Sequence, residues 1–371
     1  MATPRLEIDL GKIRQNARSL VERLKVRGIA VTGVTKAVCG HPGVARAMLD
    51  GGVSGLAEAR ISNVMRLRRA GITCPVSMIR TPLPSQLDDI VLNCQTSYNT
   101  EMSVIAGLAS ASMRMKTVHS IILMVEMGDM REGILPEHLG AVARQVLGMP
   151  GVVLKGIGAN FACLQGQVPE ASDMSDLSRI AKKLEVMFDF RLATISGGNS
   201  ANLPWALGQD QPYRINDLRL GEAILLGVDP ISGHPIDGLW TDAFALIAEV
   251  IETQANPEVF RLTKGDPATP CSAAGDAPVA RSILAIGRQD TDVEGLTMPG
   301  SGVLVGATSD HTVMATSRQH PRVGSEVRFQ MNYSALMHAM AAPDIVKVPL
   351  GEAQRPESRV LNPGRSRLAL A

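Results

Sequence analysis

Aromatic residues are scarce in this chain of 371 residues, of which Phe, Trp and Tyr together make up 3%. So few rings leave little surface on which nucleic-acid bases could stack. A surplus of either charge is also missing, because 37 Lys and Arg stand against 36 Asp and Glu and leave a formal charge of +1. Such a chain produces no field that would attract nucleic acid or an anionic membrane, and neither is expected as a partner.

Cysteine is sparse too, and its pattern excludes two kinds of site. The five cysteines are widely separated and none forms a Cys-x-x-Cys pair, which argues against a disulfide framework or a zinc site and predicts a reducing compartment. The chain has no run of 18 apolar residues and no long apolar stretch in its first 20 positions. We therefore expect a soluble, cytoplasmic protein without a metal ion.

The composition of the chain, 45% hydrophobic and 20% charged, is typical of a folded enzyme. Its length is sufficient for two domains or one large barrel. From residue 29 onward, short apolar runs alternate with stretches of helical period, as in βα units around a parallel sheet. Eight strands are predicted, at 29–34, 53–56, 76–79, 96–98, 121–125, 153–157, 192–195 and 218–225. They predict an α/β fold, a closed (β/α)8 barrel of the TIM type.

The pattern changes at residues 227–235, which include two Pro and two Gly. Residues 264–278 are poor in large apolar side chains, which predicts a surface loop. Apolar runs that predict a mainly antiparallel β-domain lie at 245–251, 282–286, 303–305 and 323–329. We place the boundary near residue 232, so that residues 1–232 form the barrel and residues 233–371 form the β-domain.

Lys36 directly follows the first predicted barrel strand, at the C-terminal mouth where barrel enzymes carry their chemistry. A solvated lysine at a strand end is the alternative. A lysine removed from water instead has a lowered pKa, and its free amine forms a Schiff base with a carbonyl. Lys36 is therefore a candidate catalytic and cofactor-binding residue.

A glycine pair follows the strand predicted at 192–195. Backbone amides and hydroxyls in such a loop suit a phosphate group, although an ordinary glycine turn has the same sequence. The residues concerned are Ser196, Gly197, Gly198, Asn199 and Ser200. An amine at Lys36 and a phosphate site on another strand of one barrel together indicate pyridoxal phosphate, which has both an aldehyde and a phosphate.

Arg219 lies inside the otherwise apolar eighth strand, where an unpaired charge is costly to bury. Its side chain must meet water, a carboxylate such as Asp217 or Glu222, or another acceptor such as a pyridine nitrogen. Arg131 and Asn160 also follow apolar strands and complete a set of polar residues at the barrel mouth.

Two further motifs do not indicate a site of their own. The glycine-rich run 300–306 has no amphipathic helix after it, so it is not a dinucleotide-binding fingerprint. Asp310 and His311 lie together, but no third ligand has a useful spacing, and a turn explains the pair better than a metal site does.

The polar residues described above stand in motifs spread over most of the chain. In order, the motifs are LEIDLGKIRQNA at 6–17, VTKAVCGHP, AEARISNVMRLR, EMGDMREGI, GANFACLQG, ISGGNSANL, LRLGEAILLG, IGRQD, GATSDH and MNYSAL. Their order and spacing resemble the alanine racemase superfamily of pyridoxal phosphate enzymes, and more closely its ornithine racemase branch. The resemblance implies a barrel that holds the cofactor, a C-terminal β-domain, and a head-to-tail homodimer in which each β-domain contributes to the partner's active site.

The same resemblance implies roles for single residues. The residues implied at the cofactor are Lys36 for its aldehyde, Arg131 for its phenolic oxygen, Arg219 for its ring nitrogen, and Tyr333 with the 196–200 loop for its phosphate; Asn160 and Gly221 stand in the same motifs. Arginine stays protonated, so it would leave the ring nitrogen without a proton and weaken the cofactor as an electron sink.

Two departures from the alanine-specific pattern affect the expected chemistry. Asn160 replaces a His after the sixth strand, a change shared with the ornithine branch. The stretch 260–286 lacks the Tyr that serves as the base on the opposite face of the α-carbon, although racemisation needs proton exchange on both faces. The candidates for the missing base are Asp310 and His311 first, then Cys271 and Cys163.

Together these observations predict a pyridoxal phosphate-dependent racemase that acts on basic amino acids such as ornithine or lysine. The distal ammonium of such a substrate needs a carboxylate. The candidates are Asp290 as the first choice, then Glu222, Glu58 and Asp310. A lyase or decarboxylase on the same scaffold is the main alternative. A non-catalytic pyridoxal phosphate carrier and a scaffold without a cofactor are the others, and the residues after position 232 count against a carrier that has no β-domain.

Overall fold

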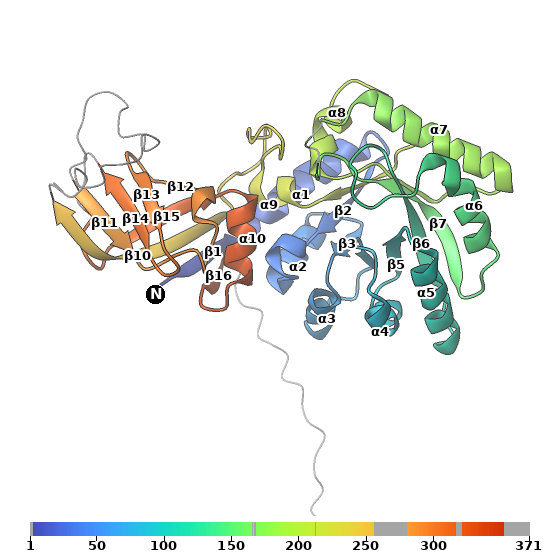
Figure 1. Cartoon of the computed structure of the whole chain (residues 1–371). Coiled ribbons are helices and arrows are strands. Elements are labelled where there is room, and N and C mark those ends of the chain that lie inside the picture. Colours follow the sequence, from blue (N-terminus) through green and yellow to red (C-terminus); the bar gives the residue numbers. More distant parts are fainter. Residues whose placement is uncertain are drawn as a thin grey trace, which may run out of the picture.

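A barrel of eight parallel strands forms the larger part of the protein (Figure 1). The computed structural model describes residues 3–351 apart from 165, 167, 212, 256–279 and 317–320. The barrel strands, in closed order, are β2 (Ala30–Val34), β3 (Gly55–Glu58), β4 (Val76–Met78), β5 (Thr96–Asn99), β6 (His119–Val125), β7 (Val152–Ala159), β8 (Thr194–Ser196) and β9 (Asp217–Leu220). Each predicted strand is found, and the (β/α)8 fold class is confirmed.

Helices cover the outside of the barrel and bury one apolar side each. In α1 the carboxylate of Asp9 accepts a hydrogen bond from the amide of Lys12 (3.0 Å) and so caps the helix start, while Ile13, Leu20 and Leu24 are fully buried. The helices are α1 (Leu10–Lys25), α2 (Pro42–Asp50), α3 (Ile61–Arg69), α4 (Leu87–Asn93), α5 (Met102–Arg114), α6 (Pro136–Leu147), α7 (Ala171–Phe188), α8 (Leu203–Leu207) and α9 (Glu222–Leu226).

The eighth strand is shorter than the sequence predicts. The expected strand at 218–225 ends at Leu220, and the helix α9 begins at Glu222 and ends at the left-handed Gly227. A short apolar run has no period that separates a buried strand from a buried helix, so the pattern alone did not reveal this change. The helix turns the side chain of Glu222 toward the barrel mouth.

The C-terminal part is a mainly antiparallel sheet, as expected. Its strands are β10 (Phe244–Ala255), β11 (Ala280–Leu284), β12 (Leu296–Thr297), β13 (Val303–Ala307), β14 (Thr312–Thr316), β15 (Glu326–Met331) and β16 (Val346–Leu350). Inward residues such as Phe329 and Leu284 are fully buried, which matches the alternating burial of β15. The surface loop expected at 264–278 lies outside the described residues.

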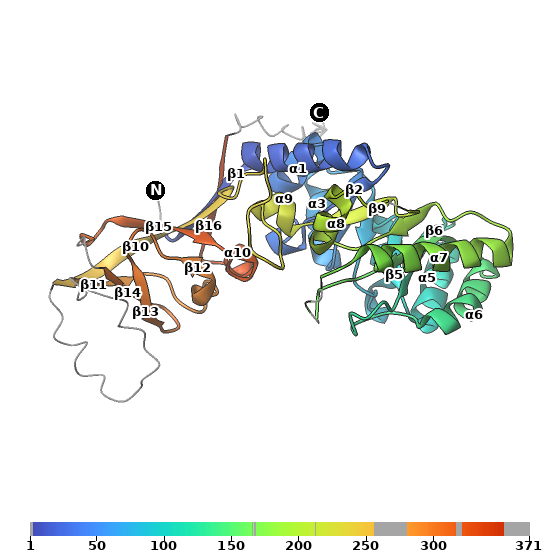
Figure 2. The same ribbon diagram turned by 90° about the horizontal axis from the view of Figure 1, so that it is seen from above.

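A strand that the sequence analysis did not predict joins this sheet. The strand β1 (Arg5–Asp9) pairs antiparallel with β10 and parallel with β16 (Figure 2). The guanidinium of Arg5 donates two hydrogen bonds to the carboxylate of Glu326, at 2.6 and 2.7 Å. Residues Arg5–Asp9 therefore lie in the sheet of the C-terminal part, and the domain boundary near residue 232 stays a prediction.

The helix α10 (Tyr333–Ala341) lies between the sheet and the barrel in Figure 1. Asn332 caps it by accepting a hydrogen bond from the amide of Ala335 (2.9 Å). The helix packs against the turn Lys36–Val38 that follows β2, so its first residue, Tyr333, reaches the barrel mouth. No helix within the described ranges is both long and apolar enough to cross a membrane.

Candidate active site

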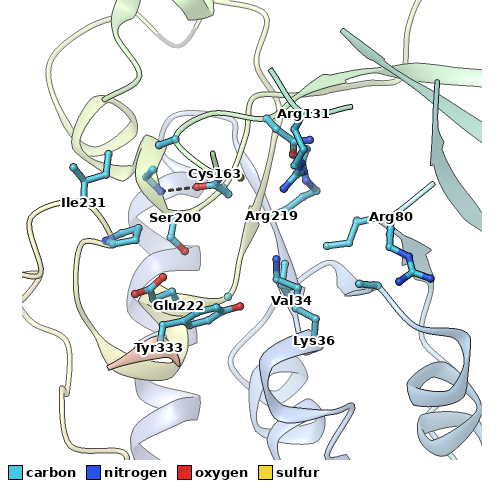
Figure 3. Close-up of a pocket in the computed structure, with 18 of the residues that line it drawn as sticks. Val34, Lys36, Arg80, Arg131, Cys163, Ser200, Arg219, Glu222, Ile231 and Tyr333 are labelled. Atoms are coloured by element: carbon cyan, nitrogen blue, oxygen red, sulfur yellow. Dashed lines mark hydrogen bonds between the residues drawn. The ribbon is translucent and has the colours of Figure 1, made fainter. Parts of the chain in front are cut away.

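A pocket of about 560 Å³ lies at the C-terminal ends of the barrel strands (Figure 3). This size is typical of sites for small organic ligands. Eight of the eleven residues that the sequence analysis placed at the cofactor line it together, namely Lys36, Arg131, Asn160, Asn199, Ser200, Arg219, Gly221 and Tyr333. The polar residues that follow the apolar barrel strands therefore lie together in this pocket.

Lys36 begins the short turn that follows β2, and its side chain points into the pocket. Burial lowers the pKa of its amine, and the neighbouring guanidinium groups of Arg131 and Arg219 lower it as well. The preceding Thr35 is fully buried and donates a hydrogen bond to the carboxylate of Glu58 (2.7 Å). Glu58, one candidate for the ammonium-binding carboxylate, thus lies behind the backbone of Lys36. A lowered pKa increases the fraction of neutral amine, which is the nucleophilic form.

Arg219 is buried at the third position of β9, yet its side chain lines the pocket. Its guanidinium donates hydrogen bonds to the carbonyl of Ala159 (2.8 Å) and to Oδ1 of Asn160 (2.9 Å), and its charge lies 5.0 Å from the ring of Tyr98.

The salt bridge considered for Arg219 is not present. Within the described part of the chain, no ion pair joins Arg219 to Asp217 or Glu222. Ser196 stands between the two groups, because its hydroxyl donates to the carboxylate of Asp217 and accepts from Arg219. Arg219 is therefore bonded directly to neutral partners, and the carboxylate of Asp217 is connected to it through the hydroxyl of Ser196.

The predicted phosphate loop divides into two parts. The hydroxyl of Ser196 is bonded to the barrel wall, and the amide of Gly197 donates to the carbonyl of Asp217 (2.9 Å). Gly198 has a φ of +125°, and a Cβ there would lie 2.1 Å from Oδ1 of Asn202, so no other residue fits. Only the end of the loop, Asn199 and Ser200, lines the pocket.

Charges in the pocket are divided between two sides. Lys36, Arg131 and Arg219 lie together, and Figure 3 shows Glu222 on the opposite side, next to Tyr333. Burial raises the pKa of the Glu222 carboxyl to about 7, Asp229 adds to the increase, and Lys36 opposes it. A molecule with an anionic and a cationic end therefore matches the pocket when its anionic end lies toward the three cations.

Arg80 is a pocket residue that the sequence analysis missed. It comes two residues after β4, so the rule that singled out Lys36 could have found it. In Figure 3 its guanidinium points away from the centre of the pocket, and Arg80 is an exposed residue.

Asp290, Asp310 and His311, which were expected to act on the substrate, also do not line the pocket of this chain. The carboxylate of Asp290 is bonded to the amide of Gly287 (2.9 Å), and that of Asp310 accepts from Gln289 (2.7 Å). His311 is exposed and lies beside Asp310 in the turn between β13 and β14. Cys271 lies outside the described residues. The roles of these residues stay predictions. In the described part of the chain, no group of three or more His, Cys, Asp or Glu could hold a metal ion.

Comparison with known proteins identifies the family. The model for the N-terminal domain of alanine racemase matches residues 8–230. The chain belongs to the alanine racemase family. Within it, a lysine racemase of Thermotoga maritima is 36% identical over 94% of this chain and 99% of its own length. An ornithine racemase of Acetoanaerobium sticklandii is 31% identical over 93% of this chain and 99% of its own length.

Several solved structures have the same fold as this chain. An alanine racemase from Streptomyces coelicolor A3(2) superposes with a TM-score of 0.72 at 19% identity, covering 94% of this chain and 98% of that one. A D-threonine aldolase from Filomicrobium marinum also reaches 0.72, at 14% identity, covering 94% of this chain and 92% of that one. The same architecture thus occurs in a racemase and an aldolase, and the fold alone does not decide the reaction.

Enzymes of the alanine racemase family use pyridoxal phosphate, and the pocket fits that group. The buried Nδ2 of Asn160 has no hydrogen-bond partner, and three cationic side chains surround the same space. A buried donor without a partner and a surplus of positive charge both call for an anionic ligand with acceptor atoms. Pyridoxal phosphate supplies a phosphate, a phenolic oxygen and a ring nitrogen as acceptors.

Proposed function

We propose that the chain is a pyridoxal phosphate-dependent racemase that interconverts the L and D forms of basic amino acids such as lysine and ornithine. The observation that carries this proposal is the lysine racemase relative, which is 36% identical over 94% of the chain. The division of charge in the pocket supports it independently, because an alanine side chain needs no carboxylate and the distal ammonium of lysine does.

The chain's own residues have distinct tasks in this proposal. The amine of Lys36 would hold the cofactor aldehyde, and when the substrate's own amine takes its place there, the freed Lys36 amine would take the α-proton of the substrate. Arg131 would donate to the phenolic oxygen, and Tyr333 would donate to the phosphate, as would Asn199 and Ser200, which line the same pocket. Burial raises the pKa of the Tyr333 phenol above its usual range, so this residue stays a neutral donor. When bound, pyridoxal phosphate accepts the electron pair that remains at the α-carbon once its proton has left.

Arg219 favours return of the proton over other reactions. Arginine is always protonated and donates hydrogen bonds only, so a bond from Arg219 to the ring nitrogen keeps a proton off that nitrogen. A ring without this proton withdraws electrons less strongly, which leaves the α-carbon basic and quick to take a proton back. Racemisation is then preferred to slower bond cleavages.

Glu222 is the residue that we assign to the distal ammonium of the substrate. It lines the pocket, whereas Asp290, the first choice from sequence, is bonded to the backbone of its own turn. Asp229 lies close enough to raise the pKa of Glu222, and the Glu222 carboxylate makes this side of the pocket increasingly negative above about pH 7. The distal ammonium of a bound lysine would then lie at Glu222, away from the arginines that hold the cofactor.

We also propose a head-to-tail homodimer, as the family resemblance implies. The exposed turn with Asp310 and His311 lies away from this chain's own pocket, which is compatible with a place beside the pocket of a second copy. Sedimentation equilibrium should then give twice the chain mass of 39.4 kDa.

The proposed reaction has a direct test. Purified protein with added pyridoxal phosphate is incubated with single L-amino acids, and the products are separated by chiral chromatography. L-Lysine and L-ornithine should each approach equal amounts of both enantiomers, faster than L-alanine does. Formation of cadaverine or putrescine without any D-amino acid would instead identify a decarboxylase on the same scaffold.

A further inference from the structure

Racemisation needs one group on each face of the α-carbon, and Lys36 accounts for one face only. Apart from Lys36 and the arginines, the pocket-lining residues with a titratable side chain are Glu132, Cys163, Glu222 and Tyr333. Glu132 is paired with Arg131 (2.6 Å). The proposed function already assigns Tyr333 to the phosphate and Glu222 to the distal ammonium of the substrate. Within the described part of the chain, Cys163 is the titratable pocket residue that is left without a task.

We propose that Cys163 is the second catalytic residue, which exchanges a proton with the face of the substrate α-carbon opposite Lys36. This inference rests on the proposed racemase function and names the group that completes it. The side chains of Asp310 and His311, expected in this role, do not line the pocket of the chain.

Cys163 and Lys36 come from different sides of the barrel mouth. Lys36 follows β2 and Cys163 follows β7, and the strands β8 and β9 separate β7 from β2. Arg219 of β9 reaches across to the end of β7 through its bonds to Ala159 and Asn160. In Figure 3, Cys163 and Lys36 lie on different sides of the pocket. A flat ligand bound between them would present one face to each residue.

The thiol of Cys163 has a defined position. The amides of Cys163 and Leu164 both donate to Oδ1 of Asp129, at 2.8 and 3.0 Å, which fixes the backbone of this loop. The side-chain amide of Asn199 donates to Sγ (3.4 Å), and Sγ donates to the carbonyl of Phe161 (3.5 Å). The amide of Asn199 would stabilise the sulfur when it is ionised.

A second observation points to a ligand at this place. The side chain of Asn160 is 9% exposed and lines the same pocket three residues before Cys163, and its Nδ2 has no hydrogen-bond partner. A buried donor of this kind is normally satisfied when the site is filled. The ligand that satisfies Asn160 therefore lies in the pocket that Cys163 also lines.

The charge states of the two residues suit a proton exchange. Desolvation raises the pKa of the Cys163 thiol, although Arg131 and Lys36 oppose the increase, and burial lowers the pKa of the Lys36 amine. These shifts favour a resting pair of a protonated thiol, which can donate a proton, and a neutral amine, which can accept one.

The proton balance closes without an oxidant or reductant. In one direction the Lys36 amine takes the α-proton, and Cys163 gives its S–H proton to the opposite face of the same carbon. One C–H bond is broken and another is formed, and the products are an ammonium and a thiolate. Water then carries a proton from the ammonium to the thiolate and restores the resting pair. The opposite enantiomer reacts with the roles exchanged.

The first test separates the two faces of the reaction. In deuterated water, Cys163→Ala should lower racemisation of lysine about 100-fold or more, while one enantiomer still exchanges its α-hydrogen for deuterium without inversion through Lys36. Cys163→Ser should also fail to racemise at neutral pH, since a hydroxyl is a much weaker acid than a thiol. Cys74→Ala is the matched control, because Cys74 does not line the pocket and is half-buried elsewhere. Circular dichroism verifies that each variant is folded.

The second test does not depend on turnover. The full-length chain is alkylated with iodoacetamide, with and without pyridoxal phosphate, and the modified cysteines are mapped by mass spectrometry. The cofactor should slow the modification of Cys163 at least about tenfold and leave that of Cys74 unchanged. Equal modification of Cys163 in both samples, or full racemase activity in Cys163→Ala, would overturn the role of Cys163 alone. A wild-type chain that binds the cofactor but racemises no amino acid would refute the proposed function and this role together.

Discussion

Replacing Glu222 with Gln tests the substrate assignment most directly, because it removes a charge from the pocket and keeps the shape of the side chain. A hydrogen bond between an ammonium and a carboxylate contributes about 1.5–3 kcal/mol. Since each 1.36 kcal/mol corresponds to a factor of ten in rate, kcat/KM for L-lysine should fall about 10- to 150-fold in this variant. L-Norleucine has the carbon chain of lysine without the ammonium, so its kcat/KM should change little.

The assignment of Glu222 also predicts the direction in which the preference for lysine changes with pH. Because burial raises the pKa of Glu222 to about 7, its carboxylate fraction should rise from ~3% at pH 5.5 to ~97% at pH 8.5. The preference of the wild type for lysine over norleucine should therefore increase as the pH rises through about 7. Other groups that titrate in this range affect both substrates and cancel in the ratio. In the Glu222→Gln variant, the ratio should be nearly constant with pH.

Initial rates of D-enantiomer formation, measured by chiral chromatography at several pH values, supply the ratio. Asp290→Asn is the comparison variant, since it also neutralises a carboxylate but one bonded to Gly287 outside the pocket. An equal loss on lysine and norleucine in Glu222→Gln would show that Glu222 acts in catalysis or folding. A loss of lysine preference in Asp290→Asn alone would favour Asp290, acting from a second copy of the chain.

Three further predictions concern the cofactor and the second base. Borohydride should abolish the visible absorbance of the holoprotein and leave a pyridoxyl group on Lys36, whereas a label on another lysine would disprove the assignment. Arg219→Glu, if folded, should slow racemisation and produce a longer-lived long-wavelength absorbance, because a carboxylate favours a protonated ring nitrogen; an unchanged rate and spectrum would contradict the contact. Mixed subunits of Lys36→Ala and Cys163→Ala should recover no activity, since both groups belong to one pocket. Recovery on mixing Lys36→Ala with an inactive Asp310→Ala chain would place the second base on the partner.

The sequence predicted those features that depend on local pattern. The barrel strands are short apolar runs between helical stretches, and Lys36, Arg131 and Asn160 were recognisable as polar residues directly after them. The position of Glu222 was not predictable in the same way, because the apolar run after Arg219 has no period that reveals where β9 ends and α9 begins.

Other features depend on contacts between distant parts of the chain. The two halves of the 196–200 loop differ because Gly198 lies against Asn202 and Gly197 is bonded to Asp217, and neither contact has a sequence signature. The strand β1 is only five residues long, and its partners are more than 230 residues away. Strand pairing over such a separation has no local signal.

The pairing of β1 also sets an order for synthesis and folding. On the ribosome, Arg5 is made long before its neighbours in the sheet, Ile247 and Val346. At about 5–20 residues per second, roughly 12–50 s pass before the first of these partners exists. During that interval the barrel strands and their helices are completed next to a strand that has no partner. An unpaired strand edge is prone to aggregation. The side chains of Arg5, Glu7 and Asp9 make this strand charged, which opposes aggregation until the partner strands have been made.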